Sequence, residues 1–153
     1  MTMKILLPVD GTEPSLHGTH FALRLAREGL AASFVLVNVQ APASLYERVT
    51  ARNDPGLIEQ AAQEVGEDLL APSAQLLLAA GIPFITTVTS GDPVQSLREI
   101  IREHGCDLVV IGSRAMGPLR RMLEGGSTSF QLIEESPVPV LLVKPPQEEA
   151  QQP

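Results

Sequence analysis

The sequence predicts an α/β fold, a five-stranded parallel sheet with helices on both faces. Short apolar, β-branched runs alternate with segments of helical spacing along most of the chain. These runs are almost continuously apolar, as in parallel strands that are buried on both faces. The 153 residues suit one domain, and no apolar run approaches the ~20 residues that a membrane span requires.

The first strand and the first helix are predicted next to each other. Residues 4–9 (KILLPV) are typical of a buried strand, and Pro8, which cannot donate to a strand ladder, lies near its carboxyl end. Residues 14–30 have helical spacing, with an apolar face made of Leu16, Ala22, Leu23, Ala26 and Leu30. A second strand is expected over residues 33–39 (SFVLVNV).

A long helix and a third strand follow. Residues 41–53 are expected to form a loop, and helical spacing then runs over residues 55–80. Pro72 removes a backbone donor inside that helix and crowds the preceding turn, which predicts a kink or a break. Residues 82–90 (IPFITTVTS) are expected to form the third strand.

The next helix has clear start and stop signals. Asp92 is a good N-cap, Pro93 suits the first helical position, and Gln95 completes a capping box. Gly105 is expected to end this helix.

Two further strands complete the sheet. Residues 107–112 (DLVVIG) form the fourth strand, residues 128–136 a short helix, and residues 138–143 (VPVLLV) the fifth strand. Residues 1–146 are therefore interpreted as a single domain, and residues 147–153 as a polar, disordered tail.

The segment IGSRAMGPLRRMLEGGSTS, residues 111–129, contains two glycine clusters around a basic stretch. Gly112 ends the fourth strand, where a glycine lets a ligand approach the backbone. A second cluster lies just before the next helix: Gly125, Gly126, Ser127 and Thr128. The free backbone amide groups at the start of that helix favour an anion. The same residues also suit an ordinary turn with an N-cap, so both interpretations stay open.

Topology tells where a ligand would bind. Two strand orders suit five parallel strands, 2-1-3-4-5 and 3-2-1-4-5, and in both cases ligands bind beyond the carboxyl ends of the strands, where the winding reverses. In the order 3-2-1-4-5, Asp10 and Gly112 flank one crevice. Asp10 also suits a turn or N-cap role in DGTEPS. The sequence has neither a P-loop nor a G-x-G-x-x-G after the first strand.

The chain resembles the universal stress proteins over roughly residues 3–144. The resemblance rests on ILLPVDGTEPS, LVNV, SGDP, DLVVIGSR and SPVPVLLVK, in that order and with matching spacing. It implies the Rossmann-like sheet order 3-2-1-4-5, the order of the adenine nucleotide alpha hydrolase-like folds. It also implies binding of ATP or another adenine nucleotide, with or without Mg.

The resemblance assigns roles to particular residues. Many family members bind ATP through G-x2-G-x9-G-[ST] after the fourth strand. Gly112 matches the first glycine, Ala115 replaces the second, and Gly126-Ser127 match the last pair in a loop one residue longer than the pattern. By resemblance Asp10 faces the adenine or its ribose, and Val39 meets the adenine through its backbone. The whole implied site is Pro8, Val9, Asp10, Val39, Ile111, Gly112, Arg114, Ala115, Gly125, Gly126, Ser127 and Thr128.

Composition excludes several functions. The net charge of −7 argues against non-specific nucleic-acid binding. The single cysteine, Cys106, allows no internal disulfide, which fits a reducing cytosol, and we expect it to be a buried, inert thiol.

No signal peptide is evident. His17 and His20 have helical spacing but no third ligand, so we expect no metal site. Spacing shows no catalytic triad or carboxylate pair.

Three functions remain. The first is a cytoplasmic nucleotide-binding stress-response regulator with little or no turnover. The second, motivated by Ala115 and the longer loop, is an interaction module that binds no nucleotide. The third is a slow ATPase, ranked last because nothing supplies a general base. The resemblance also implies a homodimer in which residues 138–143 of two copies pair antiparallel, and we expect neither a nucleic-acid nor a membrane partner.

Overall fold

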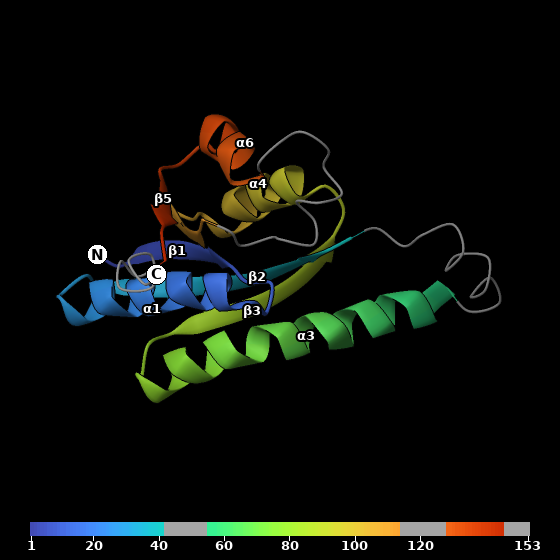
Figure 1. Ribbon diagram of the computed structural model, residues 1–153, viewed down its shortest axis with the longest axis horizontal. Coiled ribbons are helices and arrows are strands. Elements are labelled where there is room, and N and C mark those ends of the chain that lie inside the picture. Colours follow the sequence, from blue (N-terminus) through green and yellow to red (C-terminus); the bar gives the residue numbers. More distant parts are fainter. Residues whose placement is uncertain (42–54, 114–127, 146–153) are drawn as a thin grey trace, which may run out of the picture.

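The computed structural model describes residues 1–41, 55–113 and 128–145. These residues form a five-stranded parallel sheet in the order β3-β2-β1-β4-β5 (Figure 1). The predicted fold class is confirmed, and the order 3-2-1-4-5 is selected over its alternative. The strands are β1 (Met3–Pro8), β2 (Ala32–Gln40), β3 (Phe84–Ser90), β4 (Leu108–Gly112) and β5 (Val140–Val143).

Four described helices cover the two faces of the sheet. The helices α1 (Glu13–Arg27) and α3 (Pro55–Ala79) lie on one face, and α4 (Pro93–His104) and α6 (Thr128–Glu135) lie on the other (Figure 1). α1 packs on β1 and β4, whereas α3 packs on β2 and β3. In the described part of the chain, no helix is both long and apolar enough to cross a membrane.

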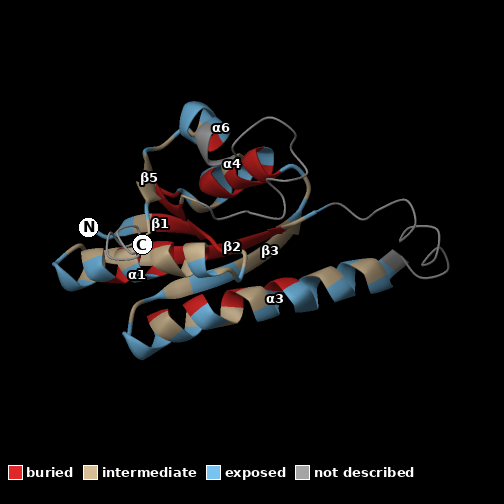
Figure 2. Cartoon of the chain, viewed as in Figure 1, coloured by how far each residue is buried: buried red, intermediate tan, exposed pale blue. Residues whose placement is uncertain are grey.

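The core consists of two apolar layers, one on each face of the sheet (Figure 2). Neighbouring residues of a strand point to opposite faces. Leu6 of β1 therefore packs in the layer under α4 and α6, while Ile5 and Leu7 pack in the layer under α1 and α3. This two-sided burial explains why the strands are apolar at almost every position.

Both ends of α4 follow the predicted signals. The Oδ2 atom of Asp92 accepts a hydrogen bond from the backbone amide of Gln95 at 2.9 Å, and Gly105 ends the helix in the left-handed region at φ 65°. Only half of the predicted capping box forms: the Gln95 side chain lies toward Glu99, to which its Nε2 donates at 3.2 Å, and does not accept from the Asp92 amide.

Some predicted boundaries shift. β3 begins at Phe84 and β5 at Val140, two residues later than predicted and each directly after a proline. A proline has no amide to donate to the ladder, although the carbonyl of Pro139 still accepts a bond from Val109 at 3.0 Å. α1 stops at Arg27, three residues early, and Gly29 follows at φ 112°.

The sequence predicted a kink or a break at Pro72, and the break does not occur, because α3 runs without interruption through this residue (Figure 1). Pro72 itself is exposed, while Leu70, Ser73 and Leu77 around it are buried. Packing of these neighbours onto the sheet holds the helical conformation on both sides of the proline and offsets the lost hydrogen bond.

The two halves of α3 differ in burial. No residue from 56 to 65 is buried, whereas Gly66 and several residues after it are (Figure 2). The close approach begins at Gly66, where an added Cβ would lie 2.4 Å from a methyl group of Val88. The amino-terminal end of the helix extends past the sheet (Figure 1).

Candidate functional site

The winding of the chain reverses between β1 and β4. These two strands pair in parallel in the middle of the sheet, with Leu6 opposite Val109, so they end at the same edge. β1 ends at Pro8 and is followed by Asp10, and β4 ends at Gly112. The structure thus places Asp10 and Gly112 at the edge where ligands bind in folds of this kind.

Asp10 organises the turn between β1 and α1. Its Oδ1 atom accepts hydrogen bonds from the backbone amide of Thr12, at 2.9 Å, and from the Thr12 hydroxyl. Its own amide donates to Ser15 Oγ at 3.3 Å. The turn role anticipated for Asp10 is therefore present. The N-cap position belongs to Thr12, whose side chain bonds Asp10 and does not cap the helix.

Gly11 lets this turn pass close to α3. It adopts φ 81°, a conformation that side chains rarely take, and an added Cβ would lie 2.5 Å from a methyl group of Leu69 on α3. The exit of β1 is therefore held by the hydrogen bonds at Asp10, and α3 passes close to it at Gly11.

On the β4 side of this edge, the structure is set by the contact between α1 and β4. A Cβ on Gly112 would lie 2.1 Å from the carbonyl oxygen of Pro14, and a Cβ on Gly18 would lie 3.2 Å from the amide nitrogen of Gly112. Gly112 was predicted to admit a ligand to the backbone. In the structure the space of its missing side chain is taken by the first turn of α1.

This close approach also changes the buried face of α1. The buried residues of its first half are Ser15, Gly18 and Thr19, which are small or polar, whereas Leu16 is only half-buried. Of the predicted apolar face, Ala22 and Leu23 are buried in α1, and Leu30, which follows the helix, packs against the same core layer. The Thr19 hydroxyl is satisfied by a 2.8 Å hydrogen bond to Ser73 Oγ on α3.

Asn38 is a polar residue of the site edge that the sequence interpretation did not single out. It is 2% exposed near the carboxyl end of β2, and its Nδ2 donates to the carbonyl oxygen of Val9 at 2.8 Å. Its Oδ1 accepts a hydrogen bond from Nε2 of Gln40. The signal was available, because LVNVQ places a carboxamide inside an otherwise apolar strand.

Cys106 lies at the opposite end of β4, away from this edge. It is 5% exposed, and burial raises the pKa of its thiol to about 11, with the Lys4 charge opposing the shift and Asp107 reinforcing it. The prediction of a buried, inert thiol is confirmed in its burial.

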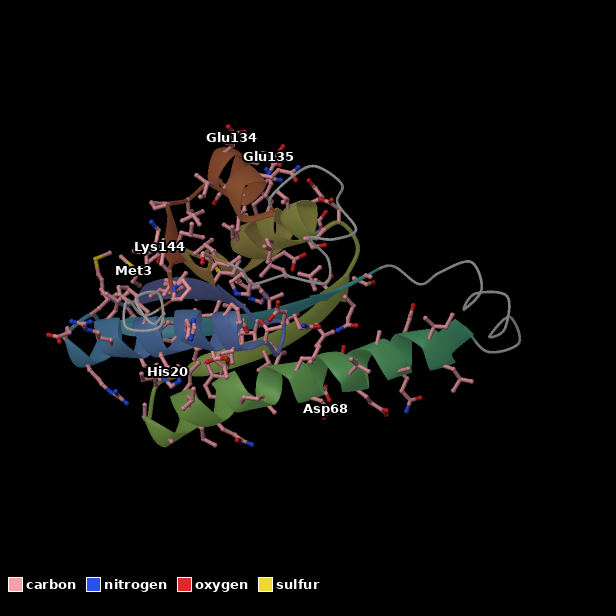
Figure 3. All side chains as sticks on the ribbon, in the orientation of Figure 1. Met3, His20, Asp68, Glu134, Glu135 and Lys144 are labelled. Carbon is pink, nitrogen blue, oxygen red and sulfur yellow. The ribbon has the colours of Figure 1, made fainter. Side chains whose placement is uncertain are left out.

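The two histidines of α1 do not gather ligands. His17 Nε2 lies 3.9 Å from Glu13 Oε1, and His20 is exposed (Figure 3). Within residues 1–41, 55–113 and 128–145, no group of His, Cys, Asp and Glu is arranged to hold a metal ion.

Comparison with known proteins gives the family. Residues 1–144 match the model of the universal stress protein family. The chain belongs to this family. Universal stress protein MJ0531 of Methanocaldococcus jannaschii is 28% identical over 95% of this chain and 84% of its own length.

Two solved structures share the fold. Hypothetical protein MJ0577 has a TM-score of 0.74 at 22% identity, covering 95% of this chain and 98% of its own. A universal stress protein of Arabidopsis thaliana with AMP bound has a TM-score of 0.65 at 18% identity, covering 96% of this chain and 94% of its own.

The site residues implied by the family fall into two groups. Pro8, Val9 and Asp10 lie at the exit of β1, Val39 is buried near the end of β2, and Ile111 and Gly112 end β4. Thr128 begins α6. The remaining residues lie outside the described part of the chain: Arg114, Ala115, Gly125, Gly126 and Ser127.

Proposed function

We propose that the chain is an adenine-nucleotide-binding regulatory protein of the universal stress family, acting in the cytoplasm. The observation that carries this proposal is the fixed edge between β1 and β4, where Asp10 and Gly112 flank the point of strand reversal. Such a point is the usual ligand-binding place of an open parallel sheet. The AMP held by the Arabidopsis relative on the same fold supports an adenine nucleotide as the ligand.

The rigidity of the β1 exit supports binding at this edge. Asp10 is held by Thr12 and Ser15, and Val9 is bonded through both its amide, to Val37 at 2.8 Å, and its carbonyl, to Asn38. A preorganised edge avoids the entropic cost of ordering a loop when a ligand binds. We propose ATP as the leading nucleotide, with Mg2+ as a second component to be tested.

The proposed role of the nucleotide is that of a signal, with little or no turnover. The sequence offers no carboxylate pair or triad with the spacing that hydrolysis requires. A phosphate-release assay at saturating ATP tests this point, and steady release that disappears in the Asp10→Ala variant would establish an ATPase instead.

Calorimetry with ATP, with and without Mg2+, tests the proposed binding. We expect saturable binding by the wild type. The Asp10→Ala variant, which removes the carboxylate, should bind about 10-fold more weakly or worse, because hydrogen bonds to charged groups contribute about 1.5–3 kcal/mol. The Asp10→Asn variant keeps an acceptor for Thr12 but removes the charge. It therefore separates the effect of the charge on ATP binding from the effect of the turn.

Asp68→Ala is the matched control, because Asp68 is an exposed acid on α3 (Figure 3). It should bind ATP like the wild type. Undetectable binding by the wild type at millimolar ATP refutes the proposed function. Nucleotide that co-purifies with the wild type, identified by mass spectrometry after denaturation, would support it independently.

A second candidate is a dimeric interaction module that binds no nucleotide. The observation that favours it is the open edge of β5, which pairs only with β4 in the described sheet and whose four apolar residues are all half-buried. An apolar edge strand is a template for pairing with another strand. We propose that two copies pair through residues 138–143, a contact compatible with either candidate function.

A further inference from the structure

β3 forms one open edge of the sheet (Figure 1). It pairs with β2 over the whole of Phe84–Ser90 without a bulge. The carbonyl of Pro83 and the amide of Gly91 both bond to β2. By alternation, the backbone groups that face outward belong to four residues: Phe84, Thr86, Val88 and Ser90. Within the described residues, no backbone or side-chain group bonds to these outward groups.

This edge lacks the usual protection against pairing. Proteins commonly guard an edge strand with charged side chains, a proline, a bulge or a short length. The strand FITTVTS has no charge and no proline, none of its residues is fully buried, and Ile85 is 48% exposed (Figure 2). β5, the other edge strand, has only four residues and follows Pro139 directly. β3 is therefore the longer and less protected edge, and it suits the addition of a further strand.

A strand added beside β3 would have two different faces, because successive side chains of a strand point to opposite sides of the sheet. On the side of α4, β3 presents Ile85, Thr87 and Thr89, which pair with β2 residues of the core layer under that helix. All three are β-branched, and they are half-buried or exposed. β-branched apolar side chains of an added strand would pack against them. The other face of the added strand would lie over α3.

The α3 side of this edge is negatively charged. α3 contains no Lys, Arg or His, and no residue from 53 to 97 is a cation. The carboxylates of the helix are Glu59, Glu64, Glu67 and Asp68. Among the residues that the structure describes, none of these carboxylates forms an ion pair. Basic side chains on an added strand would therefore complement this side of the edge.

Glu67 is the carboxylate that lies along the open edge. Gly66 faces β3, where an added Cβ would lie 2.4 Å from a methyl group of Val88, and Leu69 faces the exit of β1 next to Gly11. Positions two apart on a helix differ by about 200° in direction, so Glu67 points away from the side of Leu69. It is exposed on the flank of α3 that is remote from β1.

We propose that β3 is a docking edge for an extended segment of another protein in which basic residues alternate with β-branched apolar residues. Main-chain hydrogen bonds to the outward groups of β3 would supply binding, and the two faces of the segment would meet Glu67 and Ile85. A second copy of this chain is a poorer occupant. Pairing β3 with β3 around a twofold axis would place two α3 helices on the same face, with their carboxylates and no cation between them. The proposal does not depend on nucleotide binding.

The probe is a labelled peptide of the length of β3 that alternates Lys and Val, and fluorescence anisotropy at physiological salt measures its binding. We expect saturable binding by the wild type. A peptide with Glu in place of Lys should bind at least about tenfold more weakly, because like charges then face each other. A peptide with all Lys before all Val should also bind at least about tenfold more weakly, because it cannot present two distinct faces.

The Thr86→Pro variant tests the backbone ladder. It removes an outward amide and leaves the pairing with β2 intact, since proline is tolerated on an edge strand. It should bind the Lys-Val peptide about tenfold more weakly. Thr86→Ala, which keeps the amide, should stay within about twofold of the wild type, and thermal melting verifies that both variants fold.

The Glu67→Gln variant tests the charge and leaves the strand unchanged. It should weaken binding of the Lys-Val peptide about threefold, the size expected for one solvent-exposed ion pair. Asp68→Asn is the matched control, because it removes the same charge from the next residue, which is turned about 200° from Gly66 and away from the sheet (Figure 3). It should change the affinity by less than about 1.5-fold.

Selective binding of the alternating basic peptide that Thr86→Pro and Glu67→Gln weaken supports the proposal. No binding at millimolar peptide, or equal binding by the wild type and Thr86→Pro, overturns it. Equal effects of Glu67→Gln and Asp68→Asn overturn the assigned chemistry of the partner. A lower mass of Thr86→Pro than of the wild type in light scattering would mean that a second copy occupies this edge, which also overturns the proposal.

Discussion

Gly112 shows how one missing side chain sets the shape of the site. The carbonyl oxygen of Pro14 lies 2.1 Å from the place that a Cβ would take, so α1 reaches the end of β4 only because this residue is glycine. The sequence identified the position correctly but assigned it a different neighbour. A glycine at a strand end suits a ligand or a helix equally well, and only the tertiary structure decides between them.

Replacing Gly112 by Ala should therefore cost about 2 kcal/mol or more of unfolding free energy, because backbone has to move to accept the methyl group. Gly81→Ala is the control: Gly81 has φ 71° but no atom within 4 Å of an added Cβ, so only the conformational cost of about 1 kcal/mol applies. Urea denaturation measures both. Equal losses would show that the contact with Pro14 relaxes freely.

Cys106 predicts a dependence of stability on alkaline pH. Its pKa is raised from 9.0 to about 11 by burial, so the folded state holds this proton more tightly than the unfolded chain. The resulting stabilisation is present below pH 9 and is lost as the pH rises toward 11. At pH 10.5 the loss amounts to about 2 kcal/mol relative to pH 8.

The Cys106→Val variant isolates this effect, since valine fills a similar volume and does not titrate. Other groups that titrate at alkaline pH affect both proteins equally. The free energy of unfolding of the wild type should thus fall more steeply than that of Cys106→Val between pH 8 and pH 10.5. Parallel curves would mean that the thiol reaches solvent in the folded state.

Among the helices, α4 is the one whose ends the sequence predicted best, because it carries local signals at both of them. α4 begins at the Asp92 cap and ends at Gly105, as expected from those two residues alone. Its apolar side chains, including Leu97 and Ile100, then fill the layer above the sheet. Caps act within one turn, so they are visible in the sequence before any tertiary contact exists.

Asp92→Ala should lower the free energy of unfolding by about 1 kcal/mol, because the amide of Gln95 loses its acceptor. Asp68→Ala, an exposed acid in the interior of α3, should change it by less than about 0.5 kcal/mol. Chemical denaturation at neutral pH distinguishes the two. A cap usually contributes ~1 kcal/mol. A loss below about 0.3 kcal/mol for Asp92→Ala would therefore mean that water satisfies the Gln95 amide as well as the Asp92 carboxylate does.

The elements that sequence predicted less well depend on contacts made across the fold. Pro72 indicated a kink or a break, and the break is absent because burial of Ser73 and Leu77 keeps α3 helical through the proline. The buried face of α1 was expected to be apolar throughout, yet its first half is made of small and polar residues because the helix lies so close to β4. Neither the packing of Ser73 nor the close approach of α1 to β4 can be deduced from the spacing of apolar residues along the chain.

At the scale of the whole molecule, the sheet order was predicted through the family resemblance, since spacing alone left two orders open. In the observed order, β3 and β5 are the two edge strands. The carbonyl of Pro139 accepts a hydrogen bond from Val109 of β4, and that of Val143 accepts one from Ser113, directly after β4. By alternation the backbone groups of Val140 and Leu142 therefore face the open edge. A second copy would pair with those groups.

Light scattering at micromolar concentration tests the proposed dimer, for which we expect twice the mass of one chain. The Leu142→Pro variant removes an outward-facing amide and should give the monomer mass, while proline is tolerated on an edge strand. Leu142→Ala loses apolar surface but keeps the amide, and should remain dimeric. A monomeric wild type would refute the dimer. A dimeric Leu142→Pro variant would mean that the two copies meet through another surface.

The uneven burial of α3 has one more consequence. Its second half packs on β2 and β3. None of residues 56–65 is buried, so the helical conformation of this segment depends mainly on intrinsic helix propensity. A helical segment of that length is marginal on its own in water. Amide hydrogens of residues 56–65 should therefore exchange with solvent through local fraying, while those from Gly66 onward exchange only when the sheet itself opens.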